Sequence, residues 1–370
     1  ASYGDAITLK HNRATLQADG TIALSDGSVI HASRIVIATG AHPSVLPLEG
    51  IGKVQVLDST TAMALKTQPR SLIIIGGRAI ALELGQVFAR LGTQVTILQR
   101  SAKLIPEHEP EIAGELAQAL RDEGIAIHTL AQPQAIREEN GEKVIAATVN
   151  GQAVEFRAEH VLMAVGRTPN TQNMGLEEAN VKLDAHGFII VNDFLQTSNP
   201  RIYAVGDATQ LPKLVYVAAM SGGIAARNAL EGNSQRLDLT VLPEVIFTDP
   251  QVATVGLTEA AATAHGYDVQ VSQMPLSYVP RALAARDVRG VVKLVADKDS
   301  GRLLGAHMLA AEAGEVIQTA AMALRFGLQS GFTVNDLSGM LFPYLTQVEG
   351  LKLAAIGFKK DLAQLSCCAS

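Results

Sequence analysis

The chain has 370 residues, of which 48% are hydrophobic and 18% charged, and its formal net charge is −6 at pH 7. This length is sufficient for two or three domains, and a negatively charged chain without a Lys/Arg cluster argues against nucleic-acid binding. No apolar stretch is long enough to span a bilayer, and residues 1–10 lack the pattern of a signal peptide, so we expect a soluble, cytoplasmic protein.

The N-terminal part predicts a β-meander over residues 1–37, because short apolar stretches alternate there with Asp-Gly turn signals. The meander leads into a buried strand, which ends in a turn of small residues formed by Ala38, Thr39 and Gly40. A short helix is predicted at residues 58–65.

The clearest pattern in the chain begins at residues 71–75, four of which are Leu or Ile, as in a strand buried on both faces. Gly76 and Gly77 end this run, a helical pattern covers residues 79–91, and a second apolar run covers residues 95–98. Strand, glycine turn, helix and strand within about 30 residues predict the βαβ unit of a dinucleotide-binding domain.

The glycine turn is suited to phosphate binding, because glycines let the backbone approach the ligand and a helix N-terminus presents free N–H groups. On the pattern G-x-G-x-x-G/A, the chain has Gly76, then Arg78 in place of the second glycine, and then Ala81. The match is partial. A buried βαβ unit with a tight turn and no ligand is therefore the alternative.

The end of the second strand bears on the choice of dinucleotide. NAD sites place an acidic residue there to hold the ribose hydroxyls, whereas this chain has Gln99 followed by Arg100. An arginine suits a 2′-phosphate, so the sequence favours NADPH over NADH.

Beyond this unit, helices are predicted at residues 109–123 and 217–230. The strands between them are expected at residues 125–130, 144–149, 153–156, 161–165, 188–191 and 201–205. From residue 242 onward the pattern predicts a mostly antiparallel sheet covered by helices. Its strands are expected at residues 245–248, 251–256, 269–275, 290–296 and 303–309, and its helices at residues 312–326 and 334–341.

The chain has two cysteines, Cys367 and Cys368, which are adjacent near the C-terminus. Adjacent residues close almost no loop and strain a disulfide, so the pair is not expected to be a structural disulfide. An incidental exposed dithiol is one explanation, and a functional pair of thiols is the other.

Five motifs occur along the chain, in addition to the C-terminal sheet and helices. They are Ala38–Gly40, the βαβ unit of residues 71–100, Gly166–Asn170, Thr197–Asp207 and Phe247–Ala253. Together they resemble the flavin-dependent pyridine nucleotide–disulfide oxidoreductases, the family of glutathione reductase and lipoamide dehydrogenase. The resemblance covers essentially the whole chain.

The resemblance implies an α/β fold with FAD and NADPH as cofactors and a homodimeric assembly. A Rossmann-like NADPH domain (residues 44–170) would be inserted in a partial FAD domain (1–43 and 171–241), followed by an α+β dimerisation domain (242–370). The implied NADPH site consists of Gly76, Gly77, Arg78, Ala81, Glu83, Arg100 and Gly166. The implied FAD site consists of Ala38, Thr39, Gly40, Gly206, Asp207 and Val215.

Two of these residues have simpler explanations. In the family, the carboxylate equivalent to Asp207 binds the flavin's ribityl chain, but an aspartate here could instead cap the next helix. The family places the carboxylate equivalent to Glu83 near the contact between nicotinamide and flavin, but Glu83 could also be an ordinary surface residue.

The C-terminal region departs from the disulfide reductases. These enzymes carry a His-Pro pair whose histidine is the acid/base partner of a thiol, whereas this chain has Phe342 before Pro343. Phenylalanine carries no titratable proton. The stretches around this position, with those at residues 279–284 and 365–369, are instead similar to the mercuric reductases, one branch of the family.

This similarity suggests a role for the cysteine pair, because Hg(II) is a soft ion that prefers thiolate ligands. Cys367 and Cys368 are expected to bind Hg(II) and to deliver it to the active site of the partner subunit in a homodimer. Tyr344 is expected to assist as a phenolic oxygen ligand; its alternative is a tyrosine packed in an interface.

Two features of a complete family member are not found in this sequence: the N-terminal strand–GxGxxG–helix unit that holds the ADP half of FAD, and a Cys-x4-Cys pair. The chain is therefore interpreted as an incomplete mercuric reductase, and the activity implied for the intact protein is NADPH-dependent, FAD-mediated reduction of Hg(II) to Hg(0). The alternatives are a disulfide reductase of the same family and a non-catalytic fragment that binds nucleotide or metal.

Overall fold

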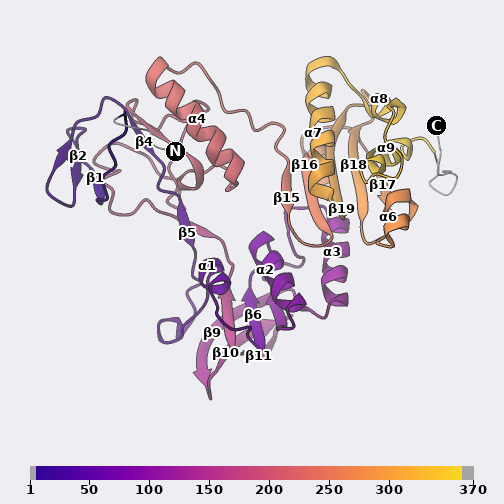
Figure 1. Ribbon diagram of the computed structural model, residues 1–370, viewed down its shortest axis with the longest axis horizontal. Helices are drawn as coiled ribbons and strands as arrows, with labels where there is room; N and C mark the ends of the chain where they lie inside the picture. Colours follow the sequence, from indigo (N-terminus) through magenta and orange to yellow (C-terminus); the bar gives the residue numbers. More distant parts are fainter. Residues whose placement is uncertain (1–5, 361–370) are drawn as a thin grey trace. The chain divides into compact units, whose positions relative to one another are not determined.

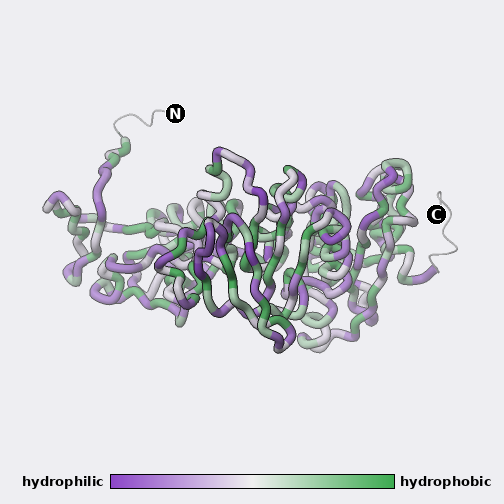
Figure 2. Tube along the Cα trace, turned by 90° about the horizontal axis from the view of Figure 1, so that it is seen from below, coloured by the Kyte–Doolittle hydropathy of each residue, from purple (hydrophilic) through white to green (hydrophobic). Residues whose placement is uncertain are grey.

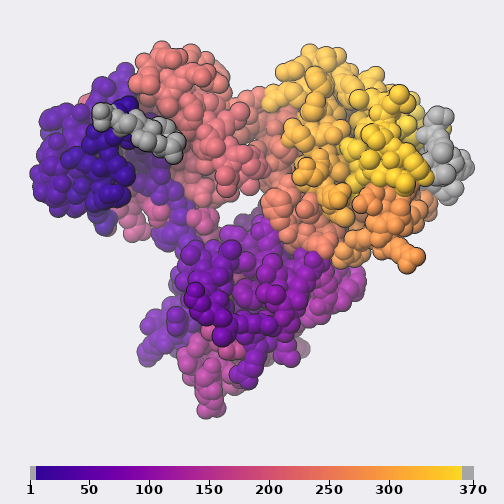
Figure 3. Space-filling view, in the orientation of Figure 1, coloured from indigo at the N-terminus to yellow at the C-terminus, as the bar shows by residue number. Residues whose placement is uncertain are grey.

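The computed structural model describes residues 6–360, which form two compact units (Figure 1). One unit consists of the described residues up to Ser44 together with Gly166–Asp238. The other consists of Val45–Val165 together with the described residues from Leu239 onward. Each unit therefore joins two segments that are far apart in the sequence, as the adjoining indigo and pink atoms of the first unit show in Figure 3.

The first unit contains short strands and one long helix. Its elements are β1 (Ala14–Leu16), β2 (Ile22–Leu24), β3 (Val29–Ile30), β4 (Ile35–Ile37), β5 (Ala41–Pro43), β13 (Arg167–Pro169), β14 (Ile202–Ala204), the 3₁₀ turn η3 (Gly206–Ala208) and α4 (Val215–Glu231). The meander β1-β2-β3 is antiparallel, as predicted, while β4 pairs in parallel with β14 and β5 pairs antiparallel with β13. Their core includes Ile37, Tyr203 and Ile224.

The prediction of a strand at residues 188–191 is wrong. Ile189 is fully buried, but it makes only isolated bridges, to Leu183 and Thr209. Its backbone N–H donates to the carbonyl of Ala208, which lies in a turn. The apolar residues of this stretch therefore reflect burial in the core of the first unit without extended pairing.

The second unit contains the predicted βαβ pattern. The strands β6 (Ser71–Ile75) and β7 (Gln94–Leu98) flank α2 (Ala79–Arg90), and they belong to a parallel sheet with the order β12-β6-β7-β8. The other elements of this part are η2 (Ile51–Lys53), α1 (Ser59–Met63), α3 (Pro110–Asp122), β8 (Ala126–His128) and β12 (His160–Met163). The central strand β6 is buried from Leu72 to Ile75, as its apolar run predicted.

An antiparallel sheet with the order β11-β10-β9 adjoins this part. Its strands are β9 (Ala131–Glu139), β10 (Glu142–Val149) and β11 (Gln152–Ala158). The sequence did not predict β9, because the strand contains Pro133. The structure accommodates this proline at a register shift, where Pro133 and Ala135 oppose consecutive residues of β10. The carbonyl of Gln134 between them accepts the N–H of Glu49 at 3.0 Å.

The C-terminal part is an antiparallel sheet with the order β15-β16-β19-β18-β17, as predicted. Its strands are β15 (Glu244–Ile246), β16 (Gln251–Gly256), β17 (Val269–Pro275), β18 (Val291–Asp297) and β19 (Leu303–Ala310). Its helices are α5 (Glu259–Ala264), η4 (Leu276–Tyr278), α6 (Pro280–Ala285), α7 (Ala313–Ser330), α8 (Val334–Gly339) and α9 (Glu349–Ile356). The sequence analysis had not predicted α9.

Helices cover both faces of this sheet. Alternate residues such as Val292, Leu294 and Met308 pack with α7 and α9 on one face (Figure 1). Val291 and Leu309 point to the other face and share a core with α3. The βαβ part and the C-terminal sheet therefore share one hydrophobic core within the second unit.

Hydrophobic stretches along the Cα trace are short and interrupted by hydrophilic residues (Figure 2). None of the helices within residues 6–360 is long and apolar enough to cross a membrane.

A buried lysine lies between α3 and the C-terminal sheet. The side chain of Lys293 on β18 is 1% exposed, and its Nζ lies 3.0 Å from Glu109, 3.1 Å from Glu111 and 2.7 Å from Glu259. Burial by itself lowers the pKa of Lys293, but the hydrogen bonds from Glu259, Glu109 and Glu111 outweigh it and raise that pKa above its ordinary value. The ammonium ion is therefore charged at neutral pH and satisfied on all sides.

His307 is the cross-strand neighbour of Lys293 on β19 and is also buried. Burial lowers the pKa of His307, so its imidazole is neutral at pH 7. Its Nε2 lies 3.0 Å from the carbonyl oxygen of Leu257, while its Nδ1 has no partner in the structure. The positive charge of this cluster is consequently that of Lys293.

We expect Lys293→Ala to destabilise the protein by about 3–5 kcal/mol, because it leaves the buried carboxylate of Glu109 and the partly exposed carboxylates of Glu111 and Glu259 without their cation. Unfolding in urea at pH 7 measures the loss. The matched control is Lys298→Ala, since Lys298 is 65% exposed and pairs with Asp268 at 3.7 Å, and it should cost less than about 1 kcal/mol.

The same substitution should show a pH dependence of known sign. Carboxylates that lose a cation have raised pKa values, so protonation relieves their repulsion as the pH falls from 7 towards 4. The difference between the wild type and Lys293→Ala should therefore shrink over this range. A loss of stability that is the same at every pH would instead indicate that the substitution acts through packing alone.

Candidate functional site

The turn between β6 and α2 leaves little room for a side chain at either of its glycines. Gly76 has a φ of 125°, and a Cβ atom at this residue would lie 2.3 Å from the carbonyl oxygen of Ala164. A Cβ atom on Gly77 would lie 2.9 Å from side-chain atoms of Gln99 and of Leu104. The turn is therefore packed closely against its surroundings.

The N-terminus of α2 is open. Helix α2 begins at Ala79, and the preceding residue, Arg78, has an extended backbone. No hydrogen bond from the side chain of Arg78 caps the helix, and its first turn holds no acidic residue. Ala81 is fully buried, which fits the close helix–strand packing that the third position of the motif requires. These free N–H groups and the positive helix end fit a phosphate group.

The guanidinium of Arg78 forms an ion pair with Glu107, on the loop that follows β7. This loop lies against the glycine turn, because the N–H of Ile105 donates to the carbonyl of Gly77 at 2.9 Å. The sequence analysis did not identify Glu107. It lies outside any motif, and the signal that could have found it is the unmatched positive charge of Arg78.

The end of β7 lies at the same edge of the sheet as the glycine turn, because Leu98 pairs in register with Ile75. Gln99 is buried, and its side chain donates to the carbonyl of Lys103 at 3.2 Å and accepts the N–H of Arg100 at 3.1 Å. Arg100 itself is exposed. A fixed glutamine followed by a free arginine at this edge fits a 2′-phosphate better than a pair of ribose hydroxyls.

Glu83 lies in α2, on a side that meets the C-terminal part. The carboxylate accepts the backbone N–H of Phe247 at 2.8 Å. Burial raises the pKa of Glu83, although this hydrogen bond opposes the shift. Phe247 presents a largely exposed ring. The carboxylate is thus half-buried and anchored.

The turn at Ala38–Gly40 lies against Asn170, which directly follows β13. The side-chain amide of Asn170 donates to the carbonyl of Thr39 at 2.9 Å, and the N–H of Asn170 donates to the carbonyl of Gly40 at 2.9 Å. Gly40 has a φ of 66°, and Gly166 has a φ of 127°. The turn of small residues at Ala38–Gly40 and the Gly166–Asn170 motif are therefore joined by Asn170, which the sequence analysis had not singled out for a role.

Asp207 does not cap a helix, because the residue that precedes α4 is Leu214 and no side chain bonds there. The carboxylate instead lies 3.3 Å from Nε of Arg167. This Nε is buried and makes no hydrogen bond. The simpler explanation for Asp207 as a helix cap is wrong, and a carboxylate–guanidinium pair stands in its place.

The surroundings of this pair fit a flavin nucleotide. Val215 at the start of α4 is 86% exposed, and Gly206 beside Asp207 has a φ of 61°. The first turn of α4 carries no acidic side chain. An exposed apolar side chain and a helix N-terminus without a side-chain cap suit a ligand with an apolar ring and phosphate groups.

The predicted mercury ligands lie in the C-terminal region. Tyr344 is 58% exposed, whereas the neighbouring Phe342 packs against the core of the C-terminal sheet. Cys367 and Cys368 lie outside the described residues. Within residues 6–360, no group of three or more His, Cys, Asp or Glu side chains is arranged to hold a metal ion.

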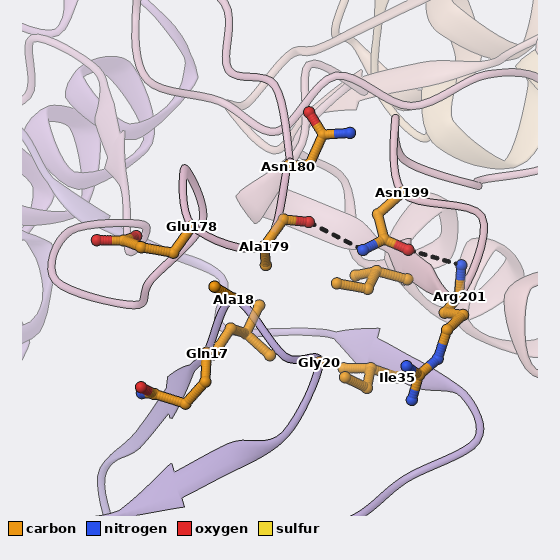
Figure 4. Close-up of a pocket in the computed structure, with 11 residues that line it drawn as sticks. Gln17, Ala18, Gly20, Ile35, Glu178, Ala179, Asn180, Asn199 and Arg201 are labelled. Atoms are coloured by element: carbon orange, nitrogen blue, oxygen red, sulfur yellow. Dashed lines mark hydrogen bonds between the residues drawn. The ribbon is translucent and has the colours of Figure 1, made fainter.

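A cavity of about 120 Å³ lies in the first unit, between the meander and the loop before β14 (Figure 4). The side chain of Asn199 donates to the carbonyl of Ala179 at 2.9 Å and accepts the N–H of Arg201 at 2.9 Å. Its lining contains none of the predicted site residues. This cavity is therefore separate from the candidate nucleotide sites.

Comparison with protein families gives two matches along the chain. Residues 3–222 match the pyridine nucleotide-disulphide oxidoreductase family, and residues 242–355 match the dimerisation domain of the same family. Among solved structures, the HOCl-induced flavoprotein disulfide reductase RclA from Escherichia coli superposes with a TM-score of 0.84 and 29% sequence identity. The match covers 93% of this chain and 78% of that one.

Curated relatives are more similar in sequence. A mercuric reductase from Lysinibacillus sphaericus is 45% identical over 95% of this chain and 64% of its own length. One from Staphylococcus aureus is 46% identical over 95% of this chain and 63% of its own length. One from Streptomyces lividans is 45% identical over 100% of this chain and 77% of its own length. The chain thus spans slightly less than two thirds of the first two relatives.

These matches confirm the predicted fold class, an α/β fold with a dimerisation domain built on an antiparallel sheet. The four-part division of the chain into domains remains a prediction. The chain belongs to the pyridine nucleotide–disulphide oxidoreductase family.

Proposed function

We propose that this chain functions in the NADPH-dependent, FAD-mediated reduction of Hg(II) to Hg(0), as a cytoplasmic homodimer. The observation that carries the proposal is identity of about 45% to relatives named mercuric reductase over nearly the whole chain. The site geometry adds support, because it offers two arginines and an open helix end to a dinucleotide.

The chain's own residues would position the cofactors. The N–H groups at the start of α2 would bind the pyrophosphate of NADPH, Arg100 would bind its 2′-phosphate, and Glu83 would lie towards the nicotinamide. Asp207 with Arg167 would hold the polyol and phosphate part of FAD. When bound, the cofactors supply the electrons: a hydride from NADPH carries the two that convert Hg(II) to Hg(0).

The thiols would handle the metal. Cys367 and Cys368 would bind Hg(II) as thiolates, releasing their protons, and pass the ion on by ligand exchange, with Tyr344 as an oxygen donor on the path. The positions of all three residues in this role rest on the similarity to the mercuric reductases.

A disulfide reductase is the second candidate, because RclA, a solved structure with this fold, is named a flavoprotein disulfide reductase. This reaction needs an acid/base partner for a thiol. Phe342 stands at the expected position, packs against the core and carries no titratable proton. We therefore favour mercury(II) as the substrate.

Arg100→Glu should reverse the dinucleotide preference. Loss of the arginine and repulsion from the new carboxylate should weaken NADPH binding about tenfold to a hundredfold, while NADH, which has no 2′-phosphate, should bind at least as well as before. Isothermal titration of both nucleotides into the purified chain measures the ratio.

The control for this experiment is Lys66→Glu, which makes the same charge change at an exposed residue before the start of β6. It should leave the ratio of the two affinities unchanged. An equal loss of NADPH and NADH binding in Arg100→Glu would contradict the role of Arg100 in recognising the 2′-phosphate.

Cys367→Ser with Cys368→Ser should abolish tight Hg(II) binding, because these are the chain's only cysteines. The wild type should bind about one Hg(II) per chain in the presence of a competing monothiol, and the double variant none. NADPH affinity should not change. Retention of tight mercury binding by the double variant would refute the delivery role of the pair.

A further inference from the structure

An exposed ion pair lies beside the candidate nucleotide turn. Arg78 stands where the dinucleotide motif has its second glycine, and its guanidinium pairs with the carboxylate of Glu107. The two side chains are 67% and 52% exposed. Both residues therefore remain accessible to a ligand from solution.

The position of Arg78 favours an anion beside it. The guanidinium belongs to the residue that precedes α2, next to the positive end of the helix, whose first turn contains no acidic residue. A cation at this end is unfavourable unless a negative charge lies beside it. Glu107 supplies that charge from the loop that is bonded to Gly77 through Ile105.

Glu107 is nonetheless weakly held. Exposed ion pairs contribute little to stability, whereas a guanidinium binds a phosphate through two parallel, charge-assisted hydrogen bonds. Glu107 also has an acidic neighbour, since burial and then the charge of Glu107 raise the pKa of Glu244. A phosphate group is thus a better partner for Arg78 than this carboxylate.

We propose that Glu107 occupies the place of the dinucleotide pyrophosphate on Arg78, and that the bound dinucleotide displaces it. Glu107 is then a built-in competitor that lowers nucleotide affinity. The binding step exchanges one anionic partner of Arg78 for another and breaks no covalent bond. This inference rests on the proposed function, because it takes a dinucleotide as the ligand.

Isothermal titration of NADPH into the full chain tests the exchange in a double-mutant cycle. Glu107→Gln should tighten binding about threefold to fivefold, because the competitor is gone. Arg78→Gln should weaken binding about tenfold or more. In the Arg78→Gln background, Glu107→Gln should leave the affinity within about a factor of two, since no pair remains to be broken.

Two further probes identify the phosphate. ADP-ribose contains the pyrophosphate but no 2′-phosphate, and adenosine 2′-monophosphate contains only the latter. Glu107→Gln should tighten binding of ADP-ribose as it does that of NADPH, and leave that of adenosine 2′-monophosphate unchanged. The opposite pattern would overturn the assignment of Arg78 to the pyrophosphate.

The matched control is Glu115→Gln, which removes one negative charge from an exposed position on α3 and should change no affinity by more than about a factor of two. A tightening in Glu107→Gln that persists without Arg78, or no tightening at all, would overturn the exchange while leaving NADPH binding intact. A wild-type chain that binds no NADPH would overturn the proposed function and this inference together.

Discussion

The buried ammonium of Lys293 is the interaction on which the second unit depends. It pairs with the buried carboxylate of Glu109 at the start of α3 and with the partly exposed carboxylate of Glu259 on α5, on one face of the C-terminal sheet. A charge in this position is favourable only while its partners remain, so α3 and the sheet cannot separate without a large cost. The nucleotide turn and the C-terminal sheet therefore belong to one packed structure.

Helix α2 connects the C-terminal part of this packed structure to the candidate site. Its N-terminus forms the open end of the glycine turn, and Glu83, Gln86 and Arg90 follow at helical spacing on a side that meets residues 247–249. The side chain of Gln86 both donates to and accepts from the backbone of Asp249. A shift of the C-terminal part would thus move α2, and with it the free N–H groups that face the phosphate.

Local patterns predicted most of this architecture. The run at residues 71–75 and the strands at residues 251–256 and 269–275 have the predicted bounds, because glycine or proline stands at the end of each or directly after it. The strand that contains Pro133 was missed, since a proline argues against a strand unless a bulge accommodates it. The stretch at residues 188–191 was wrongly predicted to be a strand, because its apolar pattern reflects burial alone.

The charged contacts were beyond sequence reasoning for a different reason. Lys293 lies in an otherwise apolar strand, which signals an unusual burial, but its partners come from two distant helices. The same holds for Arg78, whose place in the motif was evident and whose partner Glu107 was not. The candidate site thus contains Arg78 at the start of α2 and the exposed Arg100 just after β7, in a chain of net charge −6. The positive charge of Arg78 at the start of a helix is unfavourable by itself and favourable beside a phosphate, and the weakly held carboxylate of Glu107 balances it when no phosphate is bound.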